Sequence, residues 1–138
     1  MKTYKTIQWE AEKRKIFGEE KWVAKLHLTD TKTLDVVAGE VAQRTSGQPS
    51  EVEGLILSYI HQIRMHVSSG QSVNIEGLGT FYPKLTTKLV ATPEDVSIKK
   101  CIKTITVGFR PDAKLRERMR ESKLKEYKDG NNVYRKEE

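Results

Sequence analysis

Polar and bulky apolar residues alternate over the first 30 positions of the chain. Residues 2–9 and 21–28 are separated by a mostly charged stretch, residues 10–20. The large side chains in the two flanking segments are Tyr4, Ile7, Trp9, Trp22, Val23 and Leu26. Aromatic and β-branched side chains favour the pleated surface of a strand. The pattern therefore predicts an N-terminal β-hairpin whose strands are joined by a charged loop.

A helical repeat replaces this alternation from residue 33 onward. In residues 33–45 the apolar positions Leu34, Val37, Ala38 and Val41 are spaced i, i+3, i+4, i+7, which marks one face of a helix. Residues 49–68 predict a second helix, because Pro49 suits the first helical position. Its apolar positions are Val52, Leu55, Ile56, Leu57, Tyr59, Ile60, Ile63 and Val67. A helix this apolar must be covered on more than one side, so we expect it to pack against its neighbour and a second subunit.

Two glycines mark a turn in the stretch SVNIEGLGTFYPKL, residues 72–85. Val73 and Ile75 alternate as in a strand, Gly77-Leu78-Gly79 turns the chain, and Thr80-Phe81 begins a return strand. Glycine tolerates positive φ and leaves room for a close backbone approach. The stretch therefore predicts two antiparallel strands.

A longer ribbon follows in residues 84–109, where KLTTKLVA is extended, TPED turns and VSIKKCIKTITVGF returns. Apolar alternation resumes only at its base, at Ile105, Val107 and Phe109. An isolated two-stranded ribbon is marginally stable in water. We therefore expect this ribbon to leave the body of the protein and to be mobile until an anionic partner holds it.

The positive charge of the chain is concentrated in one segment. Lys and Arg number 25 against 19 Asp and Glu, which gives a net charge of +6 and a sequence pI near 9.4. Residues 84–120 hold ten basic and four acidic residues, a surplus equal to the net charge of the whole chain. Such a surplus favours a polyanionic partner: nucleic acid, an anionic membrane surface or an acidic protein.

No constellation for catalysis or metal binding is present. The single cysteine, Cys101, permits no internal disulfide. His27, His61 and His66 lack ligand-like spacing, and neither a Walker-type phosphate loop nor a nucleophile–base pair occurs. We expect no enzyme activity and no cofactor. The N-terminus has no apolar core of signal-peptide length, and no apolar run reaches membrane-spanning length, so we expect a soluble, cytoplasmic protein.

Several of these residues together carry a family resemblance. They are Ser69-Gly70, Val73, Ile75, Gly77, Gly79, Thr80, Phe81, the basic ribbon, Val107-Gly108-Phe109-Arg110-Pro111 and Leu115. Over roughly residues 33–120 the chain resembles the HU and integration-host-factor family of bacterial histone-like DNA-binding proteins. The first 30 residues look like the extension of a longer HU-related subfamily. Asp112 departs from the pattern, since the family usually has glycine there.

The resemblance implies an α+β, HU-like fold. Its parts are two N-terminal helices, a three-stranded antiparallel sheet with an extended β-ribbon arm, a C-terminal helix, and an intertwined dimer, here with an extra N-terminal β-hairpin. Residues 112–128 are helical by their own pattern, with Leu115 and Met119 facing inward and the basic residues outside. The expected organisation is a hairpin extension over residues 1–30, an HU-like DNA-binding domain over 31–128 and a flexible tail over 129–138.

The resemblance also implies an architectural, nucleoid-associated protein. It binds double-stranded DNA with little sequence specificity and bends or compacts it, as a homodimer or a heterodimer with a paralogue, without a membrane partner. The expected phosphate contacts are Lys84, Lys88, Lys99, Lys100 and Lys103 on the arm and Arg110, Lys114 and Arg116 on the body. Pro93 is a candidate minor-groove wedge, although the neighbouring carboxylates of Glu94 and Asp95 oppose it.

Other interpretations fit parts of the same pattern. Edge lysines also discourage strand-to-strand aggregation. The unusual first 30 residues and the acidic ribbon turn suit an HU-fold scaffold that holds a protein partner and binds duplex DNA weakly or not at all. Basic arms also accept RNA or single strands, so the type of nucleic acid stays open at this point.

Overall fold

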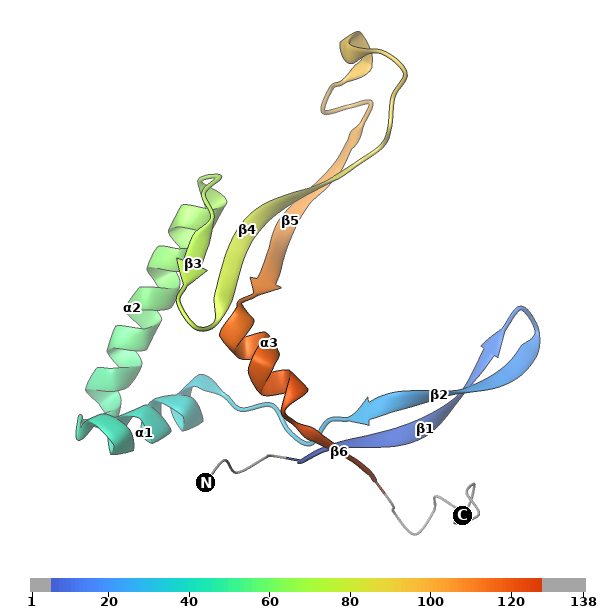
Figure 1. Ribbon diagram of the computed structural model, residues 1–138. Coiled ribbons are helices and arrows are strands. Elements are labelled where there is room, and N and C mark those ends of the chain that lie inside the picture. The colour runs from blue at the N-terminus through green and yellow to red at the C-terminus, as the bar shows by residue number, and fades with distance from the viewer. Residues whose placement is uncertain (1–5, 128–138) are drawn as a thin grey trace. The chain divides into compact units, whose positions relative to one another are not determined.

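The computed structural model describes residues 6–127, which form three α-helices and two small three-stranded sheets (Figure 1). The predicted mixed α+β class is confirmed. Contacts divide the described chain into two units, one made of residues 6–31 with 118–127 and the other of residues 32–117. Each unit is described by itself below. The predicted tail at 129–138 and Tyr4 of the first predicted strand lie outside the described residues.

The first unit contains the predicted hairpin, but without the predicted loop. Strand β1 (Thr6–Ile16) and strand β2 (Glu19–His27) are joined by Phe17 and Gly18 alone. Both turn residues have positive φ, 51° and 80°, the two-residue geometry that matches strand twist. The expected charged loop at residues 10–20 is therefore wrong, because its charges pair across the strands instead. Lys13 lies 2.6 Å from Glu20, for example.

A third strand, β6 (Lys123–Glu126), completes this sheet in the order β2-β1-β6. Helix α3 (Ala113–Arg120) ends at Arg120, so the helix predicted over residues 112–128 is wrong beyond that residue. Residues 123–126 pair with a strand that is distant in sequence instead of continuing the helix. Strand β6 runs parallel to β1 and places Leu124 beside Ile7. Residues 118–127 thus group with the unit that contains the N-terminal sheet rather than with the unit that precedes them in sequence.

The second unit begins with the two predicted helices, α1 (Leu34–Thr45) and α2 (Pro49–Ser68). Their bounds agree with the apolar repeat and with Pro49 at the helix start. Ala38 and Ala42 of α1 are almost fully buried, at 1% and 4% exposed. Small side chains allow two helices to approach closely, and α1 packs on α2 here.

The second sheet has the antiparallel order β3-β4-β5, with β3 at Val73–Ile75, β4 at Gly79–Thr87 and β5 at Ile102–Pro111. Two glycines are required in the β3–β4 turn. Gly77 has φ +83°, and a Cβ on Gly79 would lie 2.4 Å from the carbonyl oxygen of Arg110. Gly77 thus provides the positive φ of the turn, and Gly79 leaves room for the close approach of β5.

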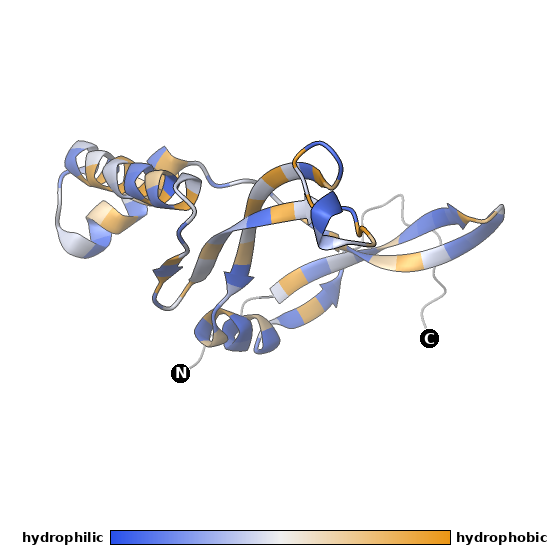
Figure 2. Ribbon diagram, turned by 90° about the horizontal axis from the view of Figure 1, so that it is seen from above, coloured by the Kyte–Doolittle hydropathy of each residue, from blue (hydrophilic) through white to orange (hydrophobic). Residues whose placement is uncertain are grey.

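The described chain has little core of its own. Among residues 6–127 the buried apolar side chains are those of Ala38, Ala42 and Cys101, whereas Leu55 is 73% exposed. Hydrophobic positions recur along α2 and along β4 and β5 (Figure 2). Between them lies an open groove of about 940 Å³. Its apolar lining includes Tyr59, Ile60, Ile63, Val67, Ile75, Leu78, Phe81, Pro83, Ile105 and Val107.

Candidate nucleic-acid interface

The ribbon formed by β4 and β5 has two chemically different faces. Directly opposed residues share a face, and successive pairs alternate between faces. One face carries the apolar pairs Phe81–Phe109, Pro83–Val107 and Leu85–Ile105. The Phe81 and Phe109 ring centroids are 4.8 Å apart. Residues of this face also line the groove against α2, so the apolar face of the ribbon is turned toward the helix.

The opposite face of the ribbon is polar and basic. Its pairs are Thr80–Arg110, Tyr82–Gly108, Lys84–Thr106 and Thr86–Thr104. The guanidinium carbon of Arg110 lies 5.3 Å from the centre of the Tyr82 ring, within cation–π range. Gly108 gives the ring its space, because a Cβ there would lie 2.4 Å from Tyr82. The aromatic ring thus holds an arginine at the base of a threonine- and lysine-bearing surface.

Strand pairing stops before the ribbon ends. A register irregularity follows Thr86, after which Thr87 opposes Ile102 and Lys103 has no Cα partner in the register. We call the remaining residues, 88–101, the ribbon tip. Pro93–Asp95 form one turn of 3₁₀-helix there. The backbone N–H of Lys88 donates to the Cys101 carbonyl at 2.7 Å and closes the tip at its base.

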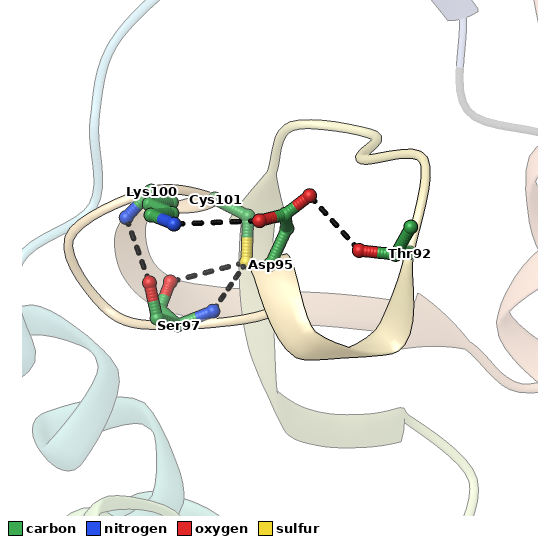
Figure 3. A network of polar contacts seen from close by, with 5 residues as sticks. All are labelled: Thr92, Asp95, Ser97, Lys100 and Cys101. Atoms are coloured by element: carbon green, nitrogen blue, oxygen red, sulfur yellow. Dashed lines mark hydrogen bonds and ion pairs between the residues drawn. The ribbon is translucent and has the colours of Figure 1, made fainter.

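A network of polar contacts folds the ribbon tip on itself (Figure 3). The Asp95 carboxylate accepts hydrogen bonds from the Thr92 hydroxyl at 2.9 Å and from Lys100 Nζ at 3.3 Å. The Cys101 thiol, only 5% exposed, accepts from the Ser97 N–H at 3.3 Å and donates to the Ser97 carbonyl at 3.1 Å. The tip therefore has internal order that the lysine pattern did not reveal.

Helix α3 (Ala113–Arg120) is joined to the β3–β4 turn through Asp112. One carboxylate oxygen of Asp112 accepts from the backbone N–H of Lys114 at 2.6 Å, and the other accepts from that of Gly77 at 3.1 Å. Asp112 thus caps the helix. The family-atypical aspartate has a structural role, and it fixes the helix that carries Lys114 and Arg116.

All eight predicted phosphate-contacting side chains are exposed in the structure. Lys84, Lys103 and Arg110 lie on the paired strands, Lys88, Lys99 and Lys100 in the ribbon tip, and Lys114 and Arg116 on α3. Lys100 differs from the others because its ammonium group contacts Asp95. Pro93 is exposed at the start of the 3₁₀ turn. Sequence reasoning missed Tyr82, whose only signal was its position two residues before Lys84 on an alternating strand.

Residues 6–127 contain neither of two further kinds of site. No group of three or more His, Cys, Asp or Glu side chains in that range is placed to hold a metal ion. No helix in the same range is long and apolar enough to cross a bilayer.

Comparison with known proteins decides the family. The family model HU-HIG, described as an HU domain fused to wHTH, Ig or a glycine-rich motif, matches residues 3–126. The chain belongs to this family. HU proteins are architectural DNA-binding proteins and not enzymes. No curated protein matches the chain.

Two solved structures share the fold of this HU-family chain. A proposed bacterial DNA-binding protein from Bacteroides vulgatus ATCC 8482 aligns with a TM-score of 0.63 at 15% identity, over 90% of this chain and 49% of the other. The chain thus spans about half the length of that protein. The Anabaena HU–DNA cocrystal structure aligns with a TM-score of 0.51 at 18% identity, over 64% of this chain and 97% of the other.

Proposed function

We propose that this HU-family protein is an architectural protein that binds duplex DNA through the ribbon with little sequence specificity, and bends or compacts it. One observation carries the proposal: the ribbon turns its apolar face toward α2, whereas Lys84, Arg110 and four threonines lie on the opposite face. Lysine and arginine side chains bind phosphates, which repeat regardless of sequence. Membership of the HU family supports the same conclusion. We expect a cytoplasmic, nucleoid-associated protein.

The proposed phosphate contacts are those of the ribbon and α3. Lys84, Lys88, Lys99 and Lys103 are exposed and extend the basic surface from the strands into the tip. Arg110, Lys114 and Arg116 continue it at the base, and Lys100 joins after leaving Asp95. Pro93 is the proposed wedge between base steps. Its support is that Asp95, one of two neighbouring carboxylates, accepts a hydrogen bond from Thr92.

We also propose that the protein works as a homodimer. With three buried apolar side chains among residues 6–127, the second unit cannot cover its own groove. A second copy of α2 has the apolar stripe to fill it, and two isologous copies would close the contact. Ile63 lines the groove, so Ile63→Asp should halve the mass measured by sedimentation. A wild-type mass equal to one chain would refute the dimer.

A salt titration of DNA binding tests the function directly. Six or more phosphate contacts should weaken binding about 10³-fold between roughly 50 and 200 mM salt. Duplexes of unrelated sequence should bind equally, and RNA or single-stranded DNA of equal length should compete poorly. If the affinity for DNA does not change with salt concentration, the proposal is wrong. If a single-stranded competitor binds more tightly than the duplex, the ligand is single-stranded nucleic acid.

A further inference from the structure

Among the described residues, strand β2 forms the long outer edge of its sheet. Within the described residues its only neighbouring strand is β1, and every residue from Glu19 to Leu26 is exposed. The nine residues contain no proline, glycine or register irregularity. Typical strands have about five or six residues, and natural edges are shortened, bulged, interrupted by proline or lined with charges. Of these protections β2 has only the charged side chains, which include Lys21 and Lys25. Such an edge is a template for another strand.

The two-residue turn fixes which backbone groups face outward. It makes Ile16 and Glu19 the closing, hydrogen-bonded pair of the hairpin. Hydrogen-bonded and non-hydrogen-bonded pairs then alternate along an antiparallel ladder. The odd-numbered residues of β2 therefore direct their N–H and C=O groups toward β1. The even-numbered residues, including Glu20 and Ala24, direct theirs to the open edge.

We propose that this edge pairs antiparallel with β2 of a second copy of the chain. In the register centred on residue 22, Glu19 of each copy lies opposite Lys25 of the other, and Glu20 lies opposite Ala24. The Glu19–Lys25 pair occurs twice, once from each copy, and its opposite charges make it favourable. Both occurrences fall at non-hydrogen-bonded positions, where side chains are closest. The register centred on residue 23 instead opposes Lys21 and Lys25 twice, which is unfavourable. The charge order of β2 thus complements itself in one register.

This contact would link molecules into larger assemblies. A dimer formed through the groove presents one β2 edge on each protomer. Pairing of those edges joins dimer to dimer and can bring separate duplexes together. The bridging consequence rests on the proposed function, whereas the strand pairing itself does not.

Proline substitution tests the pairing without opening the hairpin. Ala24→Pro removes an N–H that faces the open edge and leaves the β1–β2 ladder intact. Ala11→Pro is the matched control: Ala11 lies directly opposite Ala24, so its N–H faces the other edge, beyond the β1–β6 register, which ends at Trp9. In sedimentation velocity, the masses of wild type and Ala11→Pro should rise with concentration beyond the mass that the groove contact alone sets. Ala24→Pro should need about tenfold higher concentration.

A charge exchange tests the register. Glu19→Lys and Lys25→Glu should each weaken association, and the double variant should restore it. Lys25 also lies 3.6 Å from Glu12 of its own chain, so far-ultraviolet circular dichroism must show that each variant keeps its strands. If wild type and Ala24→Pro have equal masses at every concentration, the proposal is wrong. The same result is expected if the edge of β2 binds a different protein rather than a second copy of the chain. Ala24→Pro should bind DNA in a gel shift as the wild type does. This measurement distinguishes failure of the strand pairing from failure of DNA binding.

Discussion

Asp112 binds the backbone N–H of Gly77 at 3.1 Å, across 35 positions of sequence. The same carboxylate caps α3 through the N–H of Lys114. One side chain thus joins the glycine turn between β3 and β4 to the start of the helix that carries Lys114 and Arg116. The basic residues at the base of the ribbon are therefore placed by a short polar side chain rather than by a large apolar contact.

Replacing Asp112 should destabilise the second unit. Asp112→Ala removes a helix cap and leaves a partly buried N–H without its acceptor. We expect the free energy of unfolding to fall by about 1–2 kcal/mol, measured by urea denaturation. Asp112→Asn is the control: its single amide oxygen can still cap the helix, but its NH2 group cannot accept from Gly77, so it should recover only part of the loss. Equal losses in the two variants would show that the helix cap contributes little.

Gly108→Ala should disturb the arginine surface of the ribbon. The new Cβ would lie 2.4 Å from the Tyr82 ring, so the ring must leave its place beside Arg110. Overpacking of this kind costs about 1–3 kcal/mol. In a Tyr82→Ala background the ring is absent, and the same glycine substitution should cost much less. A double-mutant cycle on unfolding free energies checks this, and additive losses would contradict the contact.

Much of the second unit follows from its sequence because its signals are local. The apolar repeat and Pro49 define α1 and α2, and Gly77 and Gly79 define the turn between β3 and β4. The first unit was less predictable. Its charged residues look like a loop until their partners on the opposite strand are known, and Lys13 finds Glu20 only after Phe17 and Gly18 have turned the chain.

Non-local contacts account for the remaining errors. The helical pattern after Arg120 gives no sign of the distant β1, yet Tyr127 donates its backbone N–H to the Trp9 carbonyl at 2.7 Å. The lysines of the candidate interface were visible from charge alone. The order of the ribbon tip was not, because it depends on how Asp95 and Cys101 meet residues several positions away.

Asp95→Asn should strengthen DNA binding. The Asp95 carboxylate holds Lys100 at 3.3 Å, and both the ion pair and the negative charge oppose a phosphate. An exposed ion pair is worth about 0.2–1 kcal/mol, so we expect affinity to rise roughly two- to fivefold in a gel shift at low salt. Glu94→Gln removes the same charge without touching that ion pair, and its effect should be smaller. Equal gains would assign the effect to net charge.

The stability of the N-terminal sheet should depend on pH through Glu12. A hydrogen bond from Arg14 at 2.9 Å, aided by Lys25, lowers the pKa of Glu12 below its ordinary value of 4.5. A carboxyl whose folded pKa is depressed adds stability above its unfolded pKa, and loses it as pH falls through the folded value. Glu12→Gln should therefore destabilise the protein near about pH 7 and have little effect near about pH 2. Parallel stability curves for the two proteins across that range would contradict this.

Removing ribbon lysines should reduce the salt dependence of DNA binding. Each lost phosphate contact lowers the slope of log K against log salt by about 0.9, so Lys84→Gln/Lys103→Gln should reduce it by about 1.8. Lys15→Gln/Lys21→Gln removes the same charge from the N-terminal hairpin and should leave the slope unchanged. Both double variants carry the same net charge, so their difference reports location alone. If the hairpin variant lowers the slope as much as the ribbon variant does, the duplex contacts the N-terminal sheet as well, and the ribbon is not the main phosphate-binding surface.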